Sequence, residues 1–274
     1  MPTETGYVLG HDDPEVERLL LQGRLYRAHT EQALRLAGLE PGMRVLDVGC
    51  GPGDVSITAA HLVGPTGAVT AVDAQAAILD VAALRAAERR LSTITFRHAR
   101  IEDLGAAEPY DAVIGRLLLM HLPDPVAALR HLTGLVRPGG VVTFQDFQVS
   151  AATSVPELPL FTRVRDLIVR SFRGAGANTE MGTTMHELFR RAGLPAPRLI
   201  MGGYLGPLSD PDVMAFVMGV WRVLLPVAAQ LGLDLDDTVT DLAALPGRLR
   251  AEPGAENAIA ILPPLVTAWA RRPG

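Results

Sequence analysis

Three glycines separated by single residues are the first positions in the chain whose spacing suggests ligand chemistry. Gly49, Gly51 and Gly53 directly follow the apolar run at 45–48, and Asp54 comes next. Because glycine has no side chain, it lets the backbone approach a ligand closely and adopt positive φ. A dinucleotide loop would hold a diphosphate at the start of the following helix, where the Asp54 carboxylate would repel it. The glycine spacing and Asp54 therefore disfavour a nicotinamide dinucleotide, whereas a ligand with a sulfonium or ammonium group would be tolerated.

Two residue counts exclude whole classes of chemistry. All 25 residues counted as lysine or arginine are arginine, and Cys50 is the single cysteine. A chain without lysine forms neither a Schiff base nor a lysine-containing phosphate loop. One cysteine cannot form an intrachain disulfide, a multi-cysteine zinc site or an iron–sulfur cluster by itself. We interpret the Cys50 thiol as a small packed side chain, because a catalytic thiol needs a base partner and an open approach.

The remaining composition predicts an ordinary soluble protein of 274 residues with a net charge of −5. That charge argues against broad nucleic-acid binding. The first residues lack the pattern of a secretory signal, and we find no apolar run long enough to cross a membrane, so we expect a cytoplasmic location. Arginine in place of lysine, together with abundant alanine, indicates a GC-rich, bacterial coding sequence.

The glycine loop belongs to an alternation of β-rich and helical segments. The expected strands are 44–48, 68–73, 94–97, 111–115 and 141–147, with helices expected at 54–63, 76–90 and 126–136. Strands that alternate with helices are typical of βαβ units, which predict an α/β fold with a mainly parallel sheet covered by helices on both faces. A last apolar stretch at 265–270 is expected to close the sheet.

Segments outside this alternation predict an added helical cap. We divide the chain into an N-terminal helical cap (1–40), a Rossmann-like cofactor core (41–149), a lid segment with a returning helix and strand (150–204), and a helical insert with the closing strand (205–274). Prolines and glycines within 150–182 predict that part of this region is a mobile loop or lid. Met214, Phe216, Met218 and Trp221 recur near helical spacing, either as helix core or as the wall of an apolar acceptor pocket.

Five short motifs follow one another between residues 40 and 150. They are Val45-Leu46-Asp47-Val48-Gly49-Cys50-Gly51-Pro52-Gly53-Asp54, Val72-Asp73, Tyr110-Asp111-Ala112-Val113-Ile114-Gly115-Arg116, His121-Leu122-Pro123-Asp124-Pro125 and Leu135-Val136-Arg137-Pro138-Gly139-Gly140. In this order they resemble the motifs of class I S-adenosyl-L-methionine-dependent methyltransferases. The resemblance implies S-adenosyl-L-methionine as cofactor. It also implies a Rossmann-like fold with seven strands, mainly parallel, the last one antiparallel.

The resemblance further implies which residues bind the cofactor. Asp73 ends the second strand, where the family places an acid on the ribose hydroxyls, and a carboxylate can accept from two neighbouring hydroxyls. Arg100 stands where the family often has an acid for the adenine amine, so Ile101 and Glu102 are the expected substitutes. Arg116 is expected to use its carbonyl oxygen rather than its guanidinium. The expected cofactor-binding set is Tyr26, Asp47, Gly49, Cys50, Gly51, Gly53, Asp73, Ala74, Ile101, Glu102 and Arg116.

Two residues are candidates for catalysis. His121 follows the fourth strand, where a neutral imidazole would take a proton from a hydroxyl or a protonated amine; the alternative is that it organises its loop. Asp146 ends the fifth strand and either binds an acceptor amine or caps a turn. Tyr7, Tyr26 and His29 either close over the cofactor or form ordinary helix surface.

We expect no metal site, because Arg116 follows the fourth strand, where catechol-type enzymes place a magnesium-binding acid. The expected activity is transfer of a methyl group from S-adenosyl-L-methionine to an O, N or C atom of a small organic acceptor, in bacterial secondary metabolism. Two alternatives stay open: a protein that binds the cofactor without transferring methyl groups, as a regulator or ring-closing catalyst, and a nicotinamide-dependent oxidoreductase. The acceptor is the expected partner, without nucleic acid or membrane, and a homodimer through the helical insert is left open.

Overall fold

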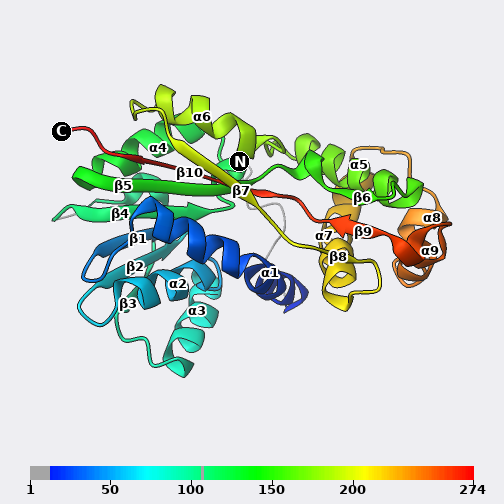
Figure 1. Cartoon of the computed structure of the whole chain (residues 1–274), viewed down its shortest axis with the longest axis horizontal. Coiled ribbons are helices and arrows are strands. Elements are labelled where there is room, and N and C mark those ends of the chain that lie inside the picture. Colours follow the sequence, from blue (N-terminus) through cyan, green and yellow to red (C-terminus); the bar gives the residue numbers. More distant parts are fainter. Residues whose placement is uncertain (1–12, 106–107) are drawn as a thin grey trace. The chain divides into compact units, whose positions relative to one another are not determined.

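The β-rich segments form one seven-stranded sheet (Figure 1). Its strands are β1 (Arg44–Val48), β2 (Ala68–Asp73), β3 (Ile94–His98), β4 (Tyr110–Arg116), β5 (Val136–Phe147), β7 (Arg198–Gly202) and β10 (Leu265–Arg271). They lie in the order β3-β2-β1-β4-β5-β10-β7, and β10 is antiparallel to both of its neighbours. The mainly parallel α/β sheet with an antiparallel last strand is confirmed.

Helices flank this sheet. They are α2 (Asp54–Val63), α3 (Ala76–Glu88), α4 (Pro125–Gly134) and α6 (Met181–Arg191), joined by the short 3-10 turns η1 (Ile101–Asp103) and η2 (Leu119–His121). α2 and α3 pack against β1, β2 and β3, whereas α4 and α6 pack against β5 and β10. Apolar side chains of β1 such as Val45 and of α2 such as Ala59 and Val63 lie wholly inside one core cluster. Burial of these side chains holds the start of α2 directly after β1.

The strand order reverses beside β1, so that β2 lies on one side of it and β4 on the other. Asp47 is in register with Ala71 of β2 and with Ile114 of β4. The carboxyl ends of these parallel strands therefore meet at one edge, the place where open α/β sheets bind ligands. We call this place the ligand edge.

The computed structural model describes residues 13–105 and 108–274, so Tyr7 lies outside the described residues. The described chain groups into two units. The sheet unit holds Tyr26–Phe147, Met181–Gly202 and Leu265–Gly274, and the second unit holds the described part of Met1–Leu25 with Gln148–Glu180 and Gly203–Pro264. Helix α1 (Asp13–Ala37) contributes residues to both. The four-part division expected from the sequence stays a prediction.

The second unit contains a small sheet that the sequence did not predict. Its antiparallel strands are β6 (Thr153–Val155), β9 (Ile259–Ile261) and β8 (Leu205–Pro207), in that order. Its helices are α5 (Pro159–Gly174), α7 (Pro211–Gln230), α8 (Asp237–Thr240) and α9 (Leu245–Ala251), and its 3-10 turns are η3 (Val149–Ala151) and η4 (Ala255–Asn257). Much of the segment in which the sequence predicted a partial loop or lid is helix α5, because Pro159 occupies the first turn, where a missing N–H costs no hydrogen bond.

Helix α7 corrects the expectation that no apolar run could cross a membrane. By length and composition alone, α7 is long and apolar enough to do so, although 44% of its most apolar window is buried inside the protein. Trp221 is wholly buried, and its indole N–H donates to the carbonyl of Val239 at 2.7 Å. Met214, Phe216 and Met218 are buried as well, and α7 packs against α5. These residues belong to the core of the second unit, the first of the two interpretations given above.

Candidate functional site

The glycine loop at the ligand edge has the backbone shape that its sequence predicts. Gly49, Gly51 and Gly53 all have positive φ, at 67°, 51° and 85°. The positive φ of Gly49 would strain any residue with a side chain, and a Cβ there would lie 2.9 Å from a methyl carbon of Leu118, which would have to move. The N–H groups of Gly49 and Cys50 donate to the carbonyl of Val72 at 2.8 and 3.0 Å. The loop is thus fixed to the end of β2.

The carboxylate of Asp73 binds the backbone of this glycine loop. Its Oδ2 accepts from the N–H of Gly51 at 2.9 Å, and its Oδ1 accepts from the N–H of Gln75 at 3.0 Å. Each carboxylate oxygen has two lone pairs, so the half-buried Asp73 can still accept from ligand hydroxyls. Ala74 beside it is exposed, and its carbonyl lies 3.0 Å from Nε2 of His98.

Asp47 is buried in β1 with one oxygen that lacks a partner. Its Oδ2 accepts from the hydroxyl of Ser56, whereas Oδ1 makes no hydrogen bond to any described residue. Burial raises the pKa of the Asp47 carboxyl to about 7, although Ser56 and Arg116 favour the ionised form. A buried carboxylate oxygen without a donor is costly, so this atom is suited to meeting a ligand that brings positive charge.

The Cys50 side chain is buried, with Sγ 3.7 Å from the carbonyl oxygen of Gly51. Burial raises the pKa of this thiol, with Asp47 and Asp73 adding to the effect. A neutral, buried thiol is a poor nucleophile. The structure therefore supports a packing role for the side chain.

Asp54 is not an isolated charge. Its carboxylate accepts from Nη2 of Arg85 at 2.7 Å, and both side chains are largely buried. Arg85 also donates to the carbonyl of Pro52. The Asp54 carboxylate is therefore largely neutralised, and its repulsion of a diphosphate is a weaker argument than the sequence suggested. The sequence did not reveal Arg85, because 31 residues separate it from Asp54.

Arg116 ends β4 and is half-buried at the ligand edge. Its Nη1 donates to the hydroxyl of Thr30 at 3.2 Å, and that hydroxyl donates to the Gln145 side chain at 2.9 Å. Burial lowers the pKa of Arg116, an effect opposed by Asp54, Asp47 and Tyr26. The Tyr26 ring lies 4.9 Å from that of Phe147, and burial raises the pKa of its hydroxyl.

Asp146 is wholly buried at the end of β5, with its Oδ2 accepting from the N–H of Leu119 at 3.1 Å. Burial raises its pKa well above the usual range, although backbone N–H groups of Leu119 and Met120 favour the charge. The bonds tie β5 to η2, which contains the half-buried His121. Asp146 thus holds the turn that carries His121, and both catalytic assignments stay predictions.

Ile101 and Glu102 lie in η1, after β3. Ile101 is half-buried, whereas the Glu102 side chain is 77% exposed and lies 4.0 Å from that of Arg100. An exposed pair of this kind stabilises the fold little. Both residues therefore remain available to a ligand at the end of β3.

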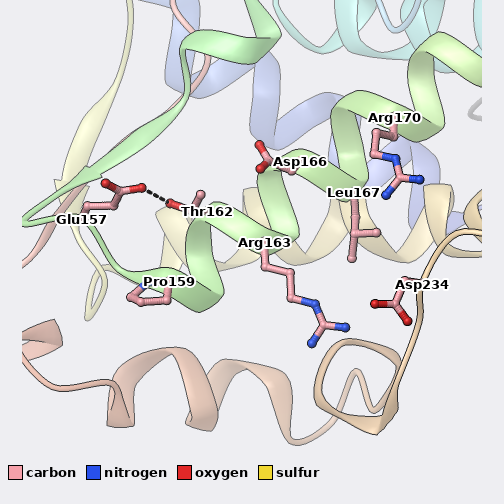
Figure 2. Close-up of a pocket in the computed structure, with 8 residues that line it drawn as sticks. All are labelled: Glu157, Pro159, Thr162, Arg163, Asp166, Leu167, Arg170 and Asp234. Carbon is pink, nitrogen blue, oxygen red and sulfur yellow. Dashed lines mark hydrogen bonds between the residues drawn. The ribbon is translucent and has the colours of Figure 1, made fainter.

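The second unit has a pocket of its own, which Figure 2 shows with its lining side chains. Its volume is about 590 Å³. The lining residues are Glu157, Pro159, Thr162, Arg163, Asp166, Leu167, Arg170 and Asp234. Arg163 pairs with Asp236 at 2.9 Å, and the lining acids outnumber the arginines. A lining that mixes acidic and basic side chains in this way favours no particular class of ligand, and we assign no ligand to this pocket.

Two curated methyltransferases are similar to part of this chain. The ubiquinone biosynthesis O-methyltransferase of Xanthomonas campestris is 42% identical over 104 residues, which cover 37% of this chain and 42% of that protein. The demethylmenaquinone methyltransferase of Halalkalibacterium halodurans is 28% identical over 151 residues, covering 55% and 59%. The chain spans about half the length of the curated relatives it matches.

Solved structures share the fold. The YcgJ protein of Bacillus subtilis has a TM-score of 0.60 at 16% identity, covering 90% of this chain and 99% of that one. A SAM-dependent methyltransferase of Aquifex aeolicus has a TM-score of 0.53 at 20% identity, covering 70% and 94%. In addition, a family model described as a methyltransferase domain matches residues 39–192, more than half of the chain. The chain therefore belongs to the methyltransferase-domain family of class I S-adenosyl-L-methionine-dependent enzymes.

Proposed function

We propose that this protein transfers the methyl group of S-adenosyl-L-methionine to an O, N or C atom of a small organic acceptor. The observation that carries the proposal is the ligand edge itself, where a glycine cradle lies between Asp73 and the unpartnered Oδ1 of Asp47. The named relatives support a small acceptor, since one is named for ubiquinone biosynthesis and the other for demethylmenaquinone. A place in bacterial secondary metabolism stays a prediction from composition.

The residues present fit this cofactor. The positive-φ glycines leave room for a close backbone approach, and Asp73 retains lone pairs for two ribose hydroxyls. Asp47, once ionised, supplies negative charge for a cationic ligand. The half-buried Ile101 is a candidate for holding adenine, with Glu102 supplying an acceptor for its amine.

S-Adenosyl-L-methionine supplies a methyl group that its sulfonium centre has already activated. The protein's task is therefore to align the reactants and to exclude water, which accounts for roughly 7–11 kcal/mol of barrier in favourable cases. Asp146 contributes by holding η2 against β5, and so fixes the backbone at His121. We assign His121 the role of general base for an acceptor hydroxyl or protonated amine.

Calorimetric titration tests the cofactor assignment. We expect S-adenosyl-L-methionine and S-adenosylhomocysteine to bind, and nicotinamide dinucleotides not to bind. Asp73→Ala should weaken S-adenosylhomocysteine binding by more than about tenfold, because charge-assisted hydrogen bonds are lost. Asp80→Ala, on the exposed surface of α3, is the matched control and should leave the affinity unchanged. Binding of a nicotinamide dinucleotide in place of both sulfur ligands would overturn the proposal.

Methyl transfer itself is tested with S-adenosyl-L-methionine labelled in its methyl group and a panel of phenol, amine and quinol-type acceptors. A labelled product is the expected result. Cofactor binding without any labelled product across the panel would favour a protein that binds without transfer. With an acceptor in hand, His121→Ala should remove the acid limb of the pH–rate profile, and a retained limb would exclude His121 as the base.

A further inference from the structure

Arg116 is a half-buried cation that forms no ion pair with any carboxylate in the described part of the chain. Its guanidinium has five N–H groups, and within residues 13–105 and 108–274 only Nη1 makes a hydrogen bond, to the hydroxyl of Thr30. None of the described acids forms an ion pair with it, although Asp47 and Asp54 lie close enough to raise its pKa. A cation that burial penalises and that keeps donors to spare is suited to an anionic ligand group.

A chain of buried polar groups holds the Thr30 hydroxyl in place. Thr30 donates to Oε1 of Gln145 at 2.9 Å, and Nε2 of Gln145 donates to the hydroxyl of Thr267 at 2.8 Å. The Thr267 hydroxyl lies 3.3 Å from Nε2 of His29. Thr30, Gln145 and Thr267 are each at most 2% exposed. We call this set, from Thr30 to His29, the polar relay.

The Gln145 amide is oriented by the two hydroxyls on either side of it, since it accepts from Thr30 and donates to Thr267. Burial lowers the pKa of His29, which favours a neutral imidazole beside the Thr267 hydroxyl. The Thr267 oxygen then accepts from the Gln145 amide, which fixes the amide oxygen toward Thr30. Because Thr30 gives its only hydrogen to Gln145, it can only accept from Arg116. The relay therefore determines where the guanidinium lies.

We propose that Arg116 binds the α-carboxylate of S-adenosyl-L-methionine and that Thr30 and Gln145 are positioning residues for its guanidinium. This assignment rests on the proposed function and replaces the expectation that Arg116 uses its carbonyl. The charges at the ligand edge favour it. Asp47 and Asp73 suit the cationic and hydroxyl parts of the cofactor, not its carboxylate. Arg85 is already paired with Asp54, whereas Arg116 still has N–H donors for an anion.

Decarboxylated S-adenosyl-L-methionine isolates the interaction, since it lacks the carboxylate and keeps the ammonium group. The measured quantity is the ratio of its dissociation constant to that of S-adenosyl-L-methionine, by calorimetry. Arg116→Gln should lower the wild-type ratio by about tenfold or more, because a charge-assisted, bidentate contact is lost. Arg85→Gln, a second cation beside the glycine loop, is the matched control and should affect both ligands alike. An unchanged ratio in Arg116→Gln, or a lowered ratio in Arg85→Gln alone, would overturn the assignment.

The relay is tested by a pair of variants. Thr30→Val removes the hydroxyl and should lower the same ratio several-fold, whereas Thr30→Ser keeps the hydroxyl and should preserve it. A merely structural role would weaken both ligands equally in Thr30→Val, and that result would refute the positioning role. If Thr30→Val does not fold, Gln145→Glu gives the second measurement, because its carboxylate cannot donate to Thr267. Failure of wild-type protein to bind either ligand would instead count against the proposed function.

Discussion

Two arginines, the buried Arg18 of the second unit and the half-buried Arg116 of the sheet unit, differ in how their guanidinium groups are bonded. In the second unit, Arg18 donates to both oxygens of Glu15 at 2.7 and 2.6 Å and to the side chain of Gln22 at 2.9 Å. In the sheet unit, Arg116 donates once, to the hydroxyl of Thr30. The first cation is satisfied by its own helix, whereas the second keeps donors in reserve.

This difference in hydrogen bonding distinguishes a residue that stabilises the fold from one that is suited to binding a ligand. A charged side chain that uses its hydrogen bonds within the fold has few donors or acceptors left for a ligand. Removing such a side chain lowers the free energy of unfolding. A charge left incomplete makes the unliganded fold less stable and gains its partner on binding. The same contrast exists among carboxylates, since Asp47 has an unpartnered oxygen and Asp111 uses both of its own.

The largest effect is expected at Arg18. Arg18→Met should lower the free energy of unfolding by roughly 3–5 kcal/mol, because the buried Glu15 carboxylate loses the guanidinium that pairs with it. Urea denaturation measures the loss, and affinity for S-adenosylhomocysteine should be unchanged in the folded fraction. The double variant Arg18→Met/Glu15→Leu should regain much of the stability. If Arg18→Met is as stable as wild type, Arg18 does not stabilise the fold and its contrast with Arg116 is wrong.

The second effect depends on pH and is expected at Asp47. Its pKa is raised in the folded protein, so its contribution to stability is full below about pH 3.8 and is lost as the pH rises through about 7. Asp47→Asn removes this dependence, so the variant should gain stability relative to wild type as the pH rises, by on the order of a few kcal/mol. Unfolding of the ligand-free protein between pH 4.5 and 8 measures the change.

Asp111→Asn is the matched control, because the pH dependence of stability that Asp111 contributes has the opposite sign to that of Asp47. Burial opposes ionisation of Asp111, but hydrogen bonds from Arg137 and from the N–H of Arg44 outweigh it and lower its pKa. Its contribution is therefore present above its unfolded pKa and is lost as the pH falls. The same pH slope in both variants would remove the distinction between the two carboxylates.

The smallest effect is expected at Arg116. Arg116→Gln should change the free energy of unfolding of the ligand-free protein by less than about 1 kcal/mol, because one hydrogen bond to a hydroxyl is lost while a penalised charge is removed. Urea denaturation without and with saturating S-adenosylhomocysteine separates the two states. Ligand should stabilise wild type more than the variant. If Arg116→Gln lowers the free energy of unfolding as much as Arg18→Met does, Arg116 stabilises the fold and is not held in reserve for a ligand.

The sheet unit was predictable from its sequence because local pattern and global fold agree there. β1, β2 and α2 begin and end where the apolar runs and the glycines of the loop predict. The second unit was less predictable, since β6, β8 and β9 have three residues each, too few for a period to emerge. Pro159 suggested a loop and instead begins α5.

Part of the candidate site could also be predicted, and the reason the rest could not is physical. Asp73 and the glycines lie close to one another in sequence, so their motifs place them together. The polar relay joins Thr30 to Gln145 across 115 positions and Gln145 to Thr267 across 122. No local pattern encodes such pairings. The one available signal was Gln145 and Asp146, two polar residues among the apolar side chains of the second half of β5, which is buried.

The place of β10 in the sheet has a consequence for how the protein is made. β10 is the last of the seven strands along the chain, yet it lies between β5 and β7. During synthesis β5 and β7 cannot reach their final neighbour until residues 265–271 have emerged, and closing so long a loop slows folding. Thr267 belongs to β10 and is therefore synthesised after every other strand of the sheet. The polar relay, and with it the geometry of the carboxylate-binding guanidinium, can form only after β10 has been synthesised.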